Sequence, residues 1–170
     1  MPAVDEATKQ RFLDTYEREH QTTMKVLRAY PADKLELRPH RLCKTARELA
    51  WVFVLERRLG AMLFDDAFAS APPRGTPPPA PQDWHELLAA LEGAHREFGD
   101  RVRRTSLEEL GAPVRFFVGP KTPGDIPRID IAWLLLLDQI HHRGQFSIYL
   151  RMADGKVPSI YGPSADEPWT

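Results

Sequence analysis

The chain has 170 residues, of which 42% are hydrophobic and 28% charged, and this is the size and composition of one globular domain spanning residues 1–170. Its 23 Lys and Arg residues nearly balance its 24 Asp and Glu residues. This balance excludes the broad positive field that holds a phosphate backbone or an anionic membrane, so we expect neither nucleic acid nor a membrane as a partner.

The chain also lacks the usual features of a secreted or membrane protein. Its single cysteine, Cys43, excludes an internal disulfide, and its first residues have neither the basic start nor the apolar run of a signal peptide. The longest apolar run, residues 131–137, is far shorter than the roughly 20 residues that span a bilayer. We therefore expect a cytoplasmic protein.

Two helices are predicted in the first half of the chain. Residues 5–30 carry a stripe of apolar and aromatic residues every three or four positions, and Pro31 ends this segment. Thr45 and Glu48 have the spacing of a capping box, which predicts a second helix that begins there and continues to Leu63. The proline-rich residues 71–81 are predicted to form an extended surface loop.

Two more helices are predicted in the second half, over residues 82–103 and 128–153. The connection between them allows only a single turn at 106–110 and an extended piece at 114–118. Gly155 is expected to take the left-handed position that ends the last helix. The remaining residues, 156–170, form an irregular tail whose aromatic residues are expected to pack over the helices or at a subunit interface.

Four amphipathic helices without a competing strand pattern predict an all-α protein. Each helix must bury one stripe against its neighbours, which is the arrangement of a four-helix bundle. The fold class is therefore an all-α four-helix bundle with long loops and an irregular C-terminal tail.

The last predicted helix carries the residues with most chemical potential. Asp138 and His142 are four apart, so they share a helix face and can point together into the bundle. A carboxylate and an imidazole placed in this way can coordinate one metal ion or exchange a proton. The structural alternative is an Asp–His hydrogen bond that fixes the helix in the core. Gly144, in the helix interior, indicates a close helix contact or access for a ligand.

The segment 141–151, HHRGQFSIYLR, followed by VPSIYGP at 157–163, resembles the C-terminal signature of the DinB-like (DinB/YfiT) superfamily. Arg38-Pro39-His40 and residues 46–50, ARELA, extend the resemblance over most of the chain. The resemblance implies a four-helix bundle, frequently a homodimer, that holds a divalent metal ion with three histidines. It also implies a small-molecule or thiol substrate, because characterised members include thiol-dependent transferases and isomerases.

The family pattern of ligands is only partly present in this chain. The resemblance places the last ligand on His142, and it places the ligand four residues earlier on Asp138, which still offers an oxygen. The second-helix ligand falls on Val52, which cannot coordinate a metal ion. Glu56, four residues after Val52, can approach the same cavity as a base or as a support for a ligand, or it can be a solvated or ion-paired residue.

His20 offers a way to complete the ligand set. It lies on the apolar stripe of the first helix, and with Asp138 and His142 it would form a two-histidine, one-carboxylate site for Zn, Ni or Fe(II). The alternative is a hydrogen-bonded histidine of the core.

Two functions of different classes follow. The first is a DinB-like protein that binds a divalent metal ion and is related to metal-dependent hydrolases and thiol transferases. The second is a metal-free, non-catalytic member that binds a small ligand or acts as a dimeric interaction module.

Overall fold

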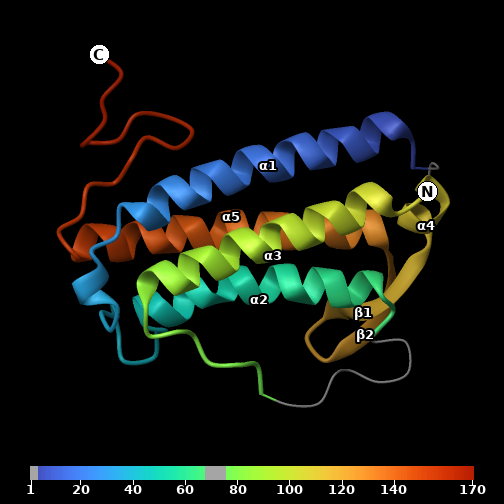
Figure 1. The fold of residues 1–170 in the computed structure, drawn as a ribbon, viewed down its shortest axis with the longest axis horizontal. Helices are drawn as coiled ribbons and strands as arrows, with labels where there is room; N and C mark the ends of the chain where they lie inside the picture. The colour runs from blue at the N-terminus through green and yellow to red at the C-terminus, as the bar shows by residue number, and fades with distance from the viewer. Residues whose placement is uncertain (1–3, 68–75) are drawn as a thin grey trace.

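The computed structural model describes residues 4–67 and 76–170 and is mostly helical (Figure 1). The long helices are α1 (Glu6–Arg28), α2 (Ala46–Phe64), α3 (Trp84–Arg104) and α5 (Arg128–Met152). Two short helices, η1 (Ala32–Lys34) and α4 (Leu107–Gly111), and two strands, β1 (Pro113–Gly119) and β2 (Thr122–Pro127), lie in the connections. Of the predicted proline-rich loop, residues 71–75 lie outside the described part, and residues 76–81 form no helix or strand.

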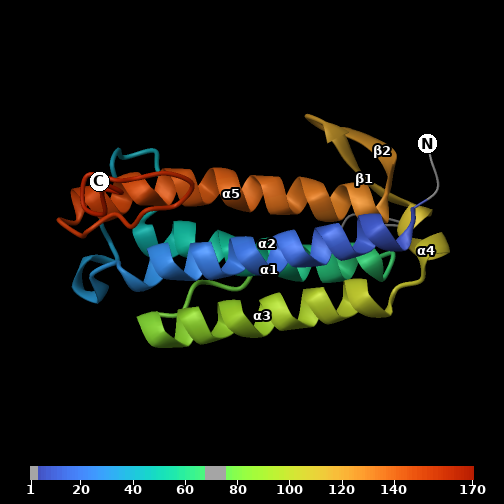
Figure 2. The same cartoon turned by 90° about the horizontal axis from the view of Figure 1, so that it is seen from above.

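The four long helices lie lengthwise beside one another, and each contacts two of the others (Figures 1 and 2). Helix α1 packs on α3 and α5, and α2 packs on the same two helices. Figure 2 shows α3 and α5 on opposite sides of the molecule, with α1 and α2 between them. The buried apolar residues of the four helices therefore face a shared interior. Among the described residues, no helix is long and apolar enough to cross a membrane.

Capping boxes fix where α2 and α4 begin. The predicted capping box of α2 is present, because the Glu48 amide donates to Thr45 Oγ1 at 3.2 Å and the Thr45 amide donates to Glu48 Oε2 at 2.7 Å. Ser106 and Glu109 form a second capping box at α4, in the place where a single turn was predicted. These local bonds satisfy backbone amides that have no partner within the helix.

The prediction of an all-α protein is wrong in one respect. Strands β1 and β2 form a two-stranded antiparallel sheet, in which Val114 is opposite Ile126. The extended piece predicted at 114–118 lies within β1. Its partner strand was missed because Pro123, Gly124 and Pro127 disfavour a strand, and only the edge position in a hairpin tolerates them.

The end of α5 also differs from its predicted form. Asp154, with φ of 60°, takes the left-handed conformation that was expected of Gly155. Gly155 avoids a close contact instead: a Cβ atom at this position would lie 2.2 Å from Leu150 Cδ1 and 3.1 Å from the Leu150 carbonyl oxygen. Its amide donates to the carbonyl of Leu150 at 3.0 Å and so closes the last turn.

A buried ion pair joins α1, α5 and the tail. Arg143 of α5 is 1% exposed, and its Nη2 lies 2.8 Å from Oε2 of the buried Glu19 in α1. Tyr161 of the tail accepts a hydrogen bond from Arg143 and donates one to Glu19 at 2.6 Å. Two further ion pairs, Lys25–Glu167 and Arg151–Asp166, hold the tail against the same two helices. The C-terminal segment is therefore part of the packed structure.

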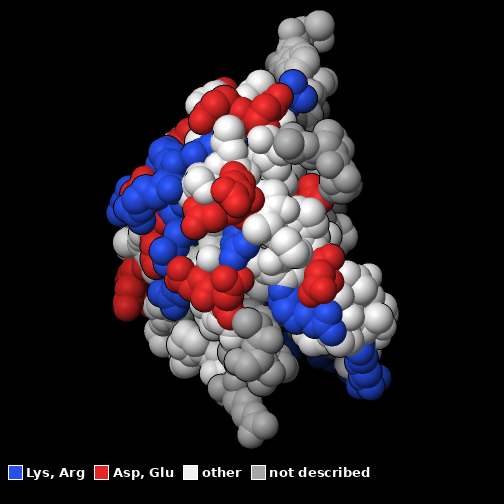
Figure 3. Space-filling view, turned by 90° about the vertical axis from the view of Figure 1, so that its right-hand side faces the viewer, with Lys and Arg blue, Asp and Glu red and all other residues white. Residues whose placement is uncertain are grey.

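Charges of both signs are mixed at the opposite end of the molecule, where α4 and the hairpin lie (Figure 3). Arg128 pairs there with Asp66 at 2.6 Å, and Arg115 pairs with Asp125 at 3.1 Å. Acidic and basic side chains alternate on this face, so it presents no field of a single sign.

We predict that Tyr161→Phe lowers the free energy of unfolding by about 1 kcal/mol, because it removes the hydroxyl that bonds Arg143 and Glu19, although Tyr161 itself is 64% exposed. Urea denaturation followed by circular dichroism measures the change. Trp169→Phe is the matched control, since it removes an exposed hydrogen bond to Ser159 and should change the same free energy by about 0.5 kcal/mol or less. Equal stabilities of Tyr161→Phe and the wild type would contradict the prediction.

Candidate metal centre

Two helices bring three potential metal ligands together. Glu56 comes from α2, and Asp138 and His142 lie one turn apart on α5. One ligand atom of each residue lies within 4.8 Å of the other two, a spacing that allows a metal ion to be held between them. The expected pairing of Asp138 with His142 is therefore present, and Glu56 is its third member.

His142 lies between the two carboxylates. Its Nε2 atom is 3.1 Å from Glu56 Oε1 and 3.7 Å from Asp138 Oδ1. The Glu56 side chain is 9% exposed, that of His142 is 21% exposed, and that of Asp138 is 53% exposed. The group therefore runs from the helix interface out to the solvent.

This placement corrects the expectation that Asp138 and His142 point into the bundle interior. The side of α5 that carries Asp138 also carries exposed Leu134 and Gln145. The apolar residues of α5 occupy more than one side of the helix, so its sequence does not identify the side that faces the interior. The site is consequently a half-open one at the edge of the α2–α5 contact.

Gln145 fixes the orientation of the His142 ring. Its Oε1 atom lies 3.1 Å from His142 Nδ1, so Nδ1 is the nitrogen that donates to Gln145. The other ring nitrogen, Nε2, then faces the two carboxylates. A histidine that binds metal commonly donates its second ring N–H to an acceptor of this kind, which fixes the tautomer. The three-residue spacing of His142 and Gln145 therefore places Gln145 where it orients the histidine ring.

The electrostatics of the group favour bound positive charge. The hydrogen bond to Glu56 raises the pKa of His142 to about 9, although burial acts in the opposite direction. Burial raises the pKa of the Glu56 carboxyl, and the hydrogen bond from His142 opposes this effect. Glu56 Oε2 is buried and has no hydrogen-bond partner among the described residues. A proton on His142 satisfies one Glu56 oxygen and leaves the other without a partner.

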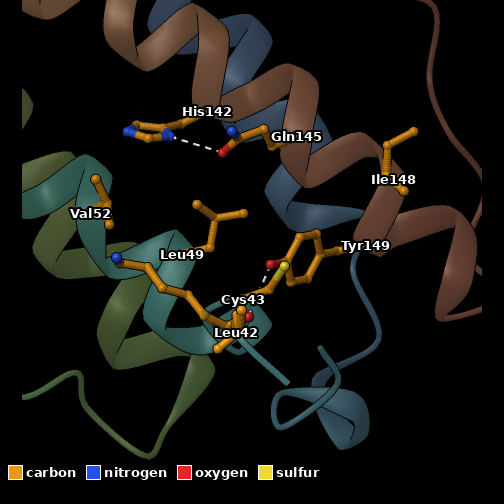
Figure 4. Close-up of a pocket in the computed structure, with 9 residues that line it drawn as sticks. Leu42, Cys43, Leu49, Val52, His142, Gln145, Ile148 and Tyr149 are labelled. Atoms are coloured by element: carbon orange, nitrogen blue, oxygen red, sulfur yellow. Dashed lines mark hydrogen bonds between the residues drawn. The ribbon is translucent and has the colours of Figure 1, made fainter. Parts of the chain in front are cut away.

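A cavity of about 530 Å³ adjoins His142 (Figure 4). Val52, at the position where the family pattern places a ligand, lines this cavity opposite His142. Glu56 lies one turn further along α2 and reaches His142 from there. From the sequence, Glu56 was interpreted only as a base, a support or an ion-paired residue. Its position four residues after Val52 was the feature that indicated its place in the site.

His20 does not belong to this group. Its ring stacks on that of His95 with centroids 3.7 Å apart, and its Nδ1 atom lies 3.4 Å from Arg57 Nη2. Among the described residues, the three-residue set that can hold an ion consists of Glu56, Asp138 and His142. The site expected from His20, Asp138 and His142 is thus not assembled, because His20 faces α3 and the guanidinium of Arg57 instead.

The fold and the site define a mostly helical protein in which an Asp–His pair on the last long helix faces a carboxylate on the second. The family model of the DinB superfamily matches residues 15–146. The chain therefore belongs to the DinB superfamily.

Individual relatives agree with this assignment. The uncharacterised protein YrdA of Bacillus subtilis is 25% identical over 160 residues, which cover 94% of this chain and 92% of that protein. A crystal structure of a DinB-like protein from Bacillus cereus superposes with a TM-score of 0.70 at 21% identity, covering 88% of this chain and 95% of the other. The DinB-like protein YjoA of Bacillus subtilis has a TM-score of 0.67 at 14% identity, with coverages of 88% and 97%. At these identities the two structures establish the fold alone.

The buried pair of His20 and His95 predicts acid sensitivity. Burial lowers the pKa of His20 to about 3 and that of His95 to about 4, so both rings are neutral in the folded protein. The unfolded chain takes up these protons near pH 6.5. The free energy of unfolding should therefore fall as the pH is lowered from about 6.5 toward 4.

Urea denaturation at a series of pH values measures this slope. His95→Phe keeps a ring in the stack and removes one titrating group, so the slope should become shallower. His85→Gln, at an exposed position, is the control and should keep the wild-type slope. A slope unchanged by His95→Phe would show that this histidine does not cause the acid sensitivity.

Proposed function

We propose that the chain is a divalent-metal-binding protein whose ion is held by Glu56, Asp138 and His142. The observation that carries the proposal is the three-residue group itself, with ligand atoms within 4.8 Å of one another at the edge of a cavity. The mutual contacts of α1, α2, α3 and α5 support a four-helix bundle as its scaffold.

The residues present fit such an ion in number, charge and chemistry. Two carboxylates carry two negative charges, which a divalent cation neutralises, and the unpartnered Glu56 Oε2 offers an oxygen that lacks a hydrogen bond. Carboxylate and imidazole ligands suit Zn, Ni and Fe(II). The orientation of His142 by Gln145 leaves Nε2 available to the ion once its proton is displaced.

A metal ion held by three protein ligands keeps open positions at which it can polarise a substrate or activate water. We propose hydrolase or transferase chemistry of this general kind, with a small-molecule or thiol substrate entering from the cavity beside His142. The protein's own contribution is to orient His142 through Gln145 and to place Glu56 where water has little access.

The competing proposal is a metal-free member that binds a ligand or a partner without catalysis. It is favoured by the raised pKa of His142, whose Nε2 already contacts both carboxylates. Val52, in place of a family ligand, is also consistent with this alternative. Metal titration separates the two proposals.

We predict that protein purified without a histidine tag binds one equivalent of Zn²⁺, Ni²⁺ or Fe²⁺ in isothermal titration calorimetry at neutral pH. Glu56→Gln and Asp138→Asn should each weaken binding at least about tenfold, and His142→Ala should abolish it, because each removes a ligand atom. Asp130→Asn removes a carboxylate from the same helix outside the group and should bind as the wild type does. Absence of stoichiometric binding of all three ions to the wild type would leave the metal-free function.

The outer face of α5 supports the proposal of a homodimer. Three large apolar side chains, those of Leu134, Leu137 and Met152, are 46–60% exposed and lie on this face at helical spacing, beside the exposed Asp138 and Gln145. A Cβ atom at Gly144, on the same face, would meet nothing within 4 Å, so packing within the chain does not explain the glycine. An apolar face beside a missing side chain suits close contact with a second copy of this helix.

We predict a dimeric mass for the wild type and a monomeric mass for Leu137→Glu in size-exclusion chromatography with light scattering. The new carboxylates would be buried without partners in a two-fold interface. Val118→Glu, a change at a similarly exposed apolar residue of β1, is the control and should stay dimeric. A monomeric wild type at high micromolar concentration would rule out this interface.

A further inference from the structure

The cavity beside His142 combines a largely aliphatic wall with a basic residue. Its lining comes from the loop before α2, from α2 and from α5, which meet there as Figure 4 shows. Aliphatic side chains form much of the wall, namely those of Leu42, Leu49, Val52 and Ile148. Among the described residues that line it, none is an Asp or a Glu, whereas Lys44, an exposed basic residue, is one of them.

The two walls of the cavity are tied together. Tyr149 of α5 donates a hydrogen bond from its hydroxyl to the carbonyl of Lys44 at 2.9 Å, which holds the loop before α2 against α5. Tyr149 is buried, and Thr45, the residue after Lys44, caps α2. The loop that carries Leu42 and Lys44 is therefore fixed to α5 through Tyr149 and to the start of α2 through Thr45. The cavity is thus formed before any ligand binds.

Apolar side chains remain exposed at the rim of the cavity. Leu42 is 78% exposed and Ile148 is 59% exposed, while Leu49 beneath them is almost fully buried. A ligand with an apolar body would cover the rim residues and remove their surface from water, and this burial favours binding. An entirely polar ligand would gain nothing from this wall.

We propose that this cavity binds a small amphipathic anion. The apolar body of the ligand lies on Leu42, Leu49 and Val52, and its anionic head lies toward His142 and Lys44. A cavity of about 530 Å³ has the volume of a small-molecule site. A cationic ligand would be repelled by Lys44, and an uncharged ligand would gain no charge interaction with it.

This inference names the substrate class of the proposed metal site, and it rests on that proposal only for the contact of the head with an ion. The contacts with Lys44 and with the apolar wall exist without a metal ion. The Asp138 and Glu56 carboxylates do not line the cavity itself. An anion in the cavity therefore contacts neither carboxylate, although they lie 3.1 Å and 3.7 Å from His142 Nε2.

The test compares three probes of equal chain length: octanoate, octanol and octylammonium. Isothermal titration calorimetry with the full chain, with and without Zn²⁺, measures each affinity. We expect octanoate to bind at least about tenfold more tightly than octanol or octylammonium. Within the series from butanoate to octanoate, affinity should rise up to about fourfold for each methylene that becomes buried.

Two variants with matched controls assign the binding to this cavity. Lys44→Glu should weaken octanoate binding at least about tenfold, whereas Arg41→Glu, an exposed change in the same loop, should leave it within about twofold. Leu42→Ser should weaken it severalfold, whereas Val118→Ser, at a similarly exposed apolar residue elsewhere, should not. Lys44 and Leu42 are both exposed at the surface, so loss of folding would not explain weaker octanoate binding by their variants.

The outcomes separate the inference from the metal proposal. Stoichiometric Zn²⁺ binding together with equal affinity for the anionic, neutral and cationic probes would overturn the inference and leave the metal site standing. Selective octanoate binding that Lys44→Glu weakens, in a protein that binds no metal ion, would support the inference and overturn the metal site. Octanoate binding that is unchanged in Lys44→Glu and Leu42→Ser would place the ligand elsewhere and overturn the inference.

Discussion

The ion pair between Arg143 and Glu19 fixes the rotation of α5, and the candidate site depends on that rotation. A fully buried guanidinium must keep its partners, and Arg143 has them in the Glu19 carboxylate, the Glu19 carbonyl and Thr23, all on α1. Because each residue advances a helix by about 100°, this leaves His142 at the edge of the contact with α2 and Asp138 nearer to solvent. One buried charge pair thus decides which side chains of α5 meet Glu56.

Much of the fold was predictable, because local signals and packing agree in the long helices. The caps at Thr45 and the stripe through Phe12 and Tyr16 are encoded over a few residues, and the structure confirms them. The strand at Thr122–Pro127 was not predictable, because its prolines argue against a strand and only its pairing with β1 produces one. The inward direction of α5 was also not predictable, since this helix carries apolar residues on its outer face as well.

The site itself was predictable only in part, because one of its three residues comes from a different helix. The spacing of Asp138 and His142 is local, so the sequence alone indicated it. The third residue comes from another helix, and its identity depends on how α2 and α5 are aligned along their lengths. That alignment brings Glu56 to His142 and Val52 to the cavity wall. For His20, the sequence placed it on a buried stripe but did not show that α3 would supply His95 as its stacking partner.

Val52 and Glu56, one turn apart on α2, connect the candidate metal centre with the cavity. A histidine at the Val52 position would direct a polar ring into the cavity, whereas valine makes that wall apolar and Glu56 offers a carboxylate one turn away. The carboxylate is buried at the helix interface, where it does not line the cavity. Neither Glu56 nor Asp138 lines the cavity, which retains a largely apolar wall with Lys44 and His142 as its basic residues. Separation of the acidic groups from the cavity is the arrangement that would let an anion reach a bound cation.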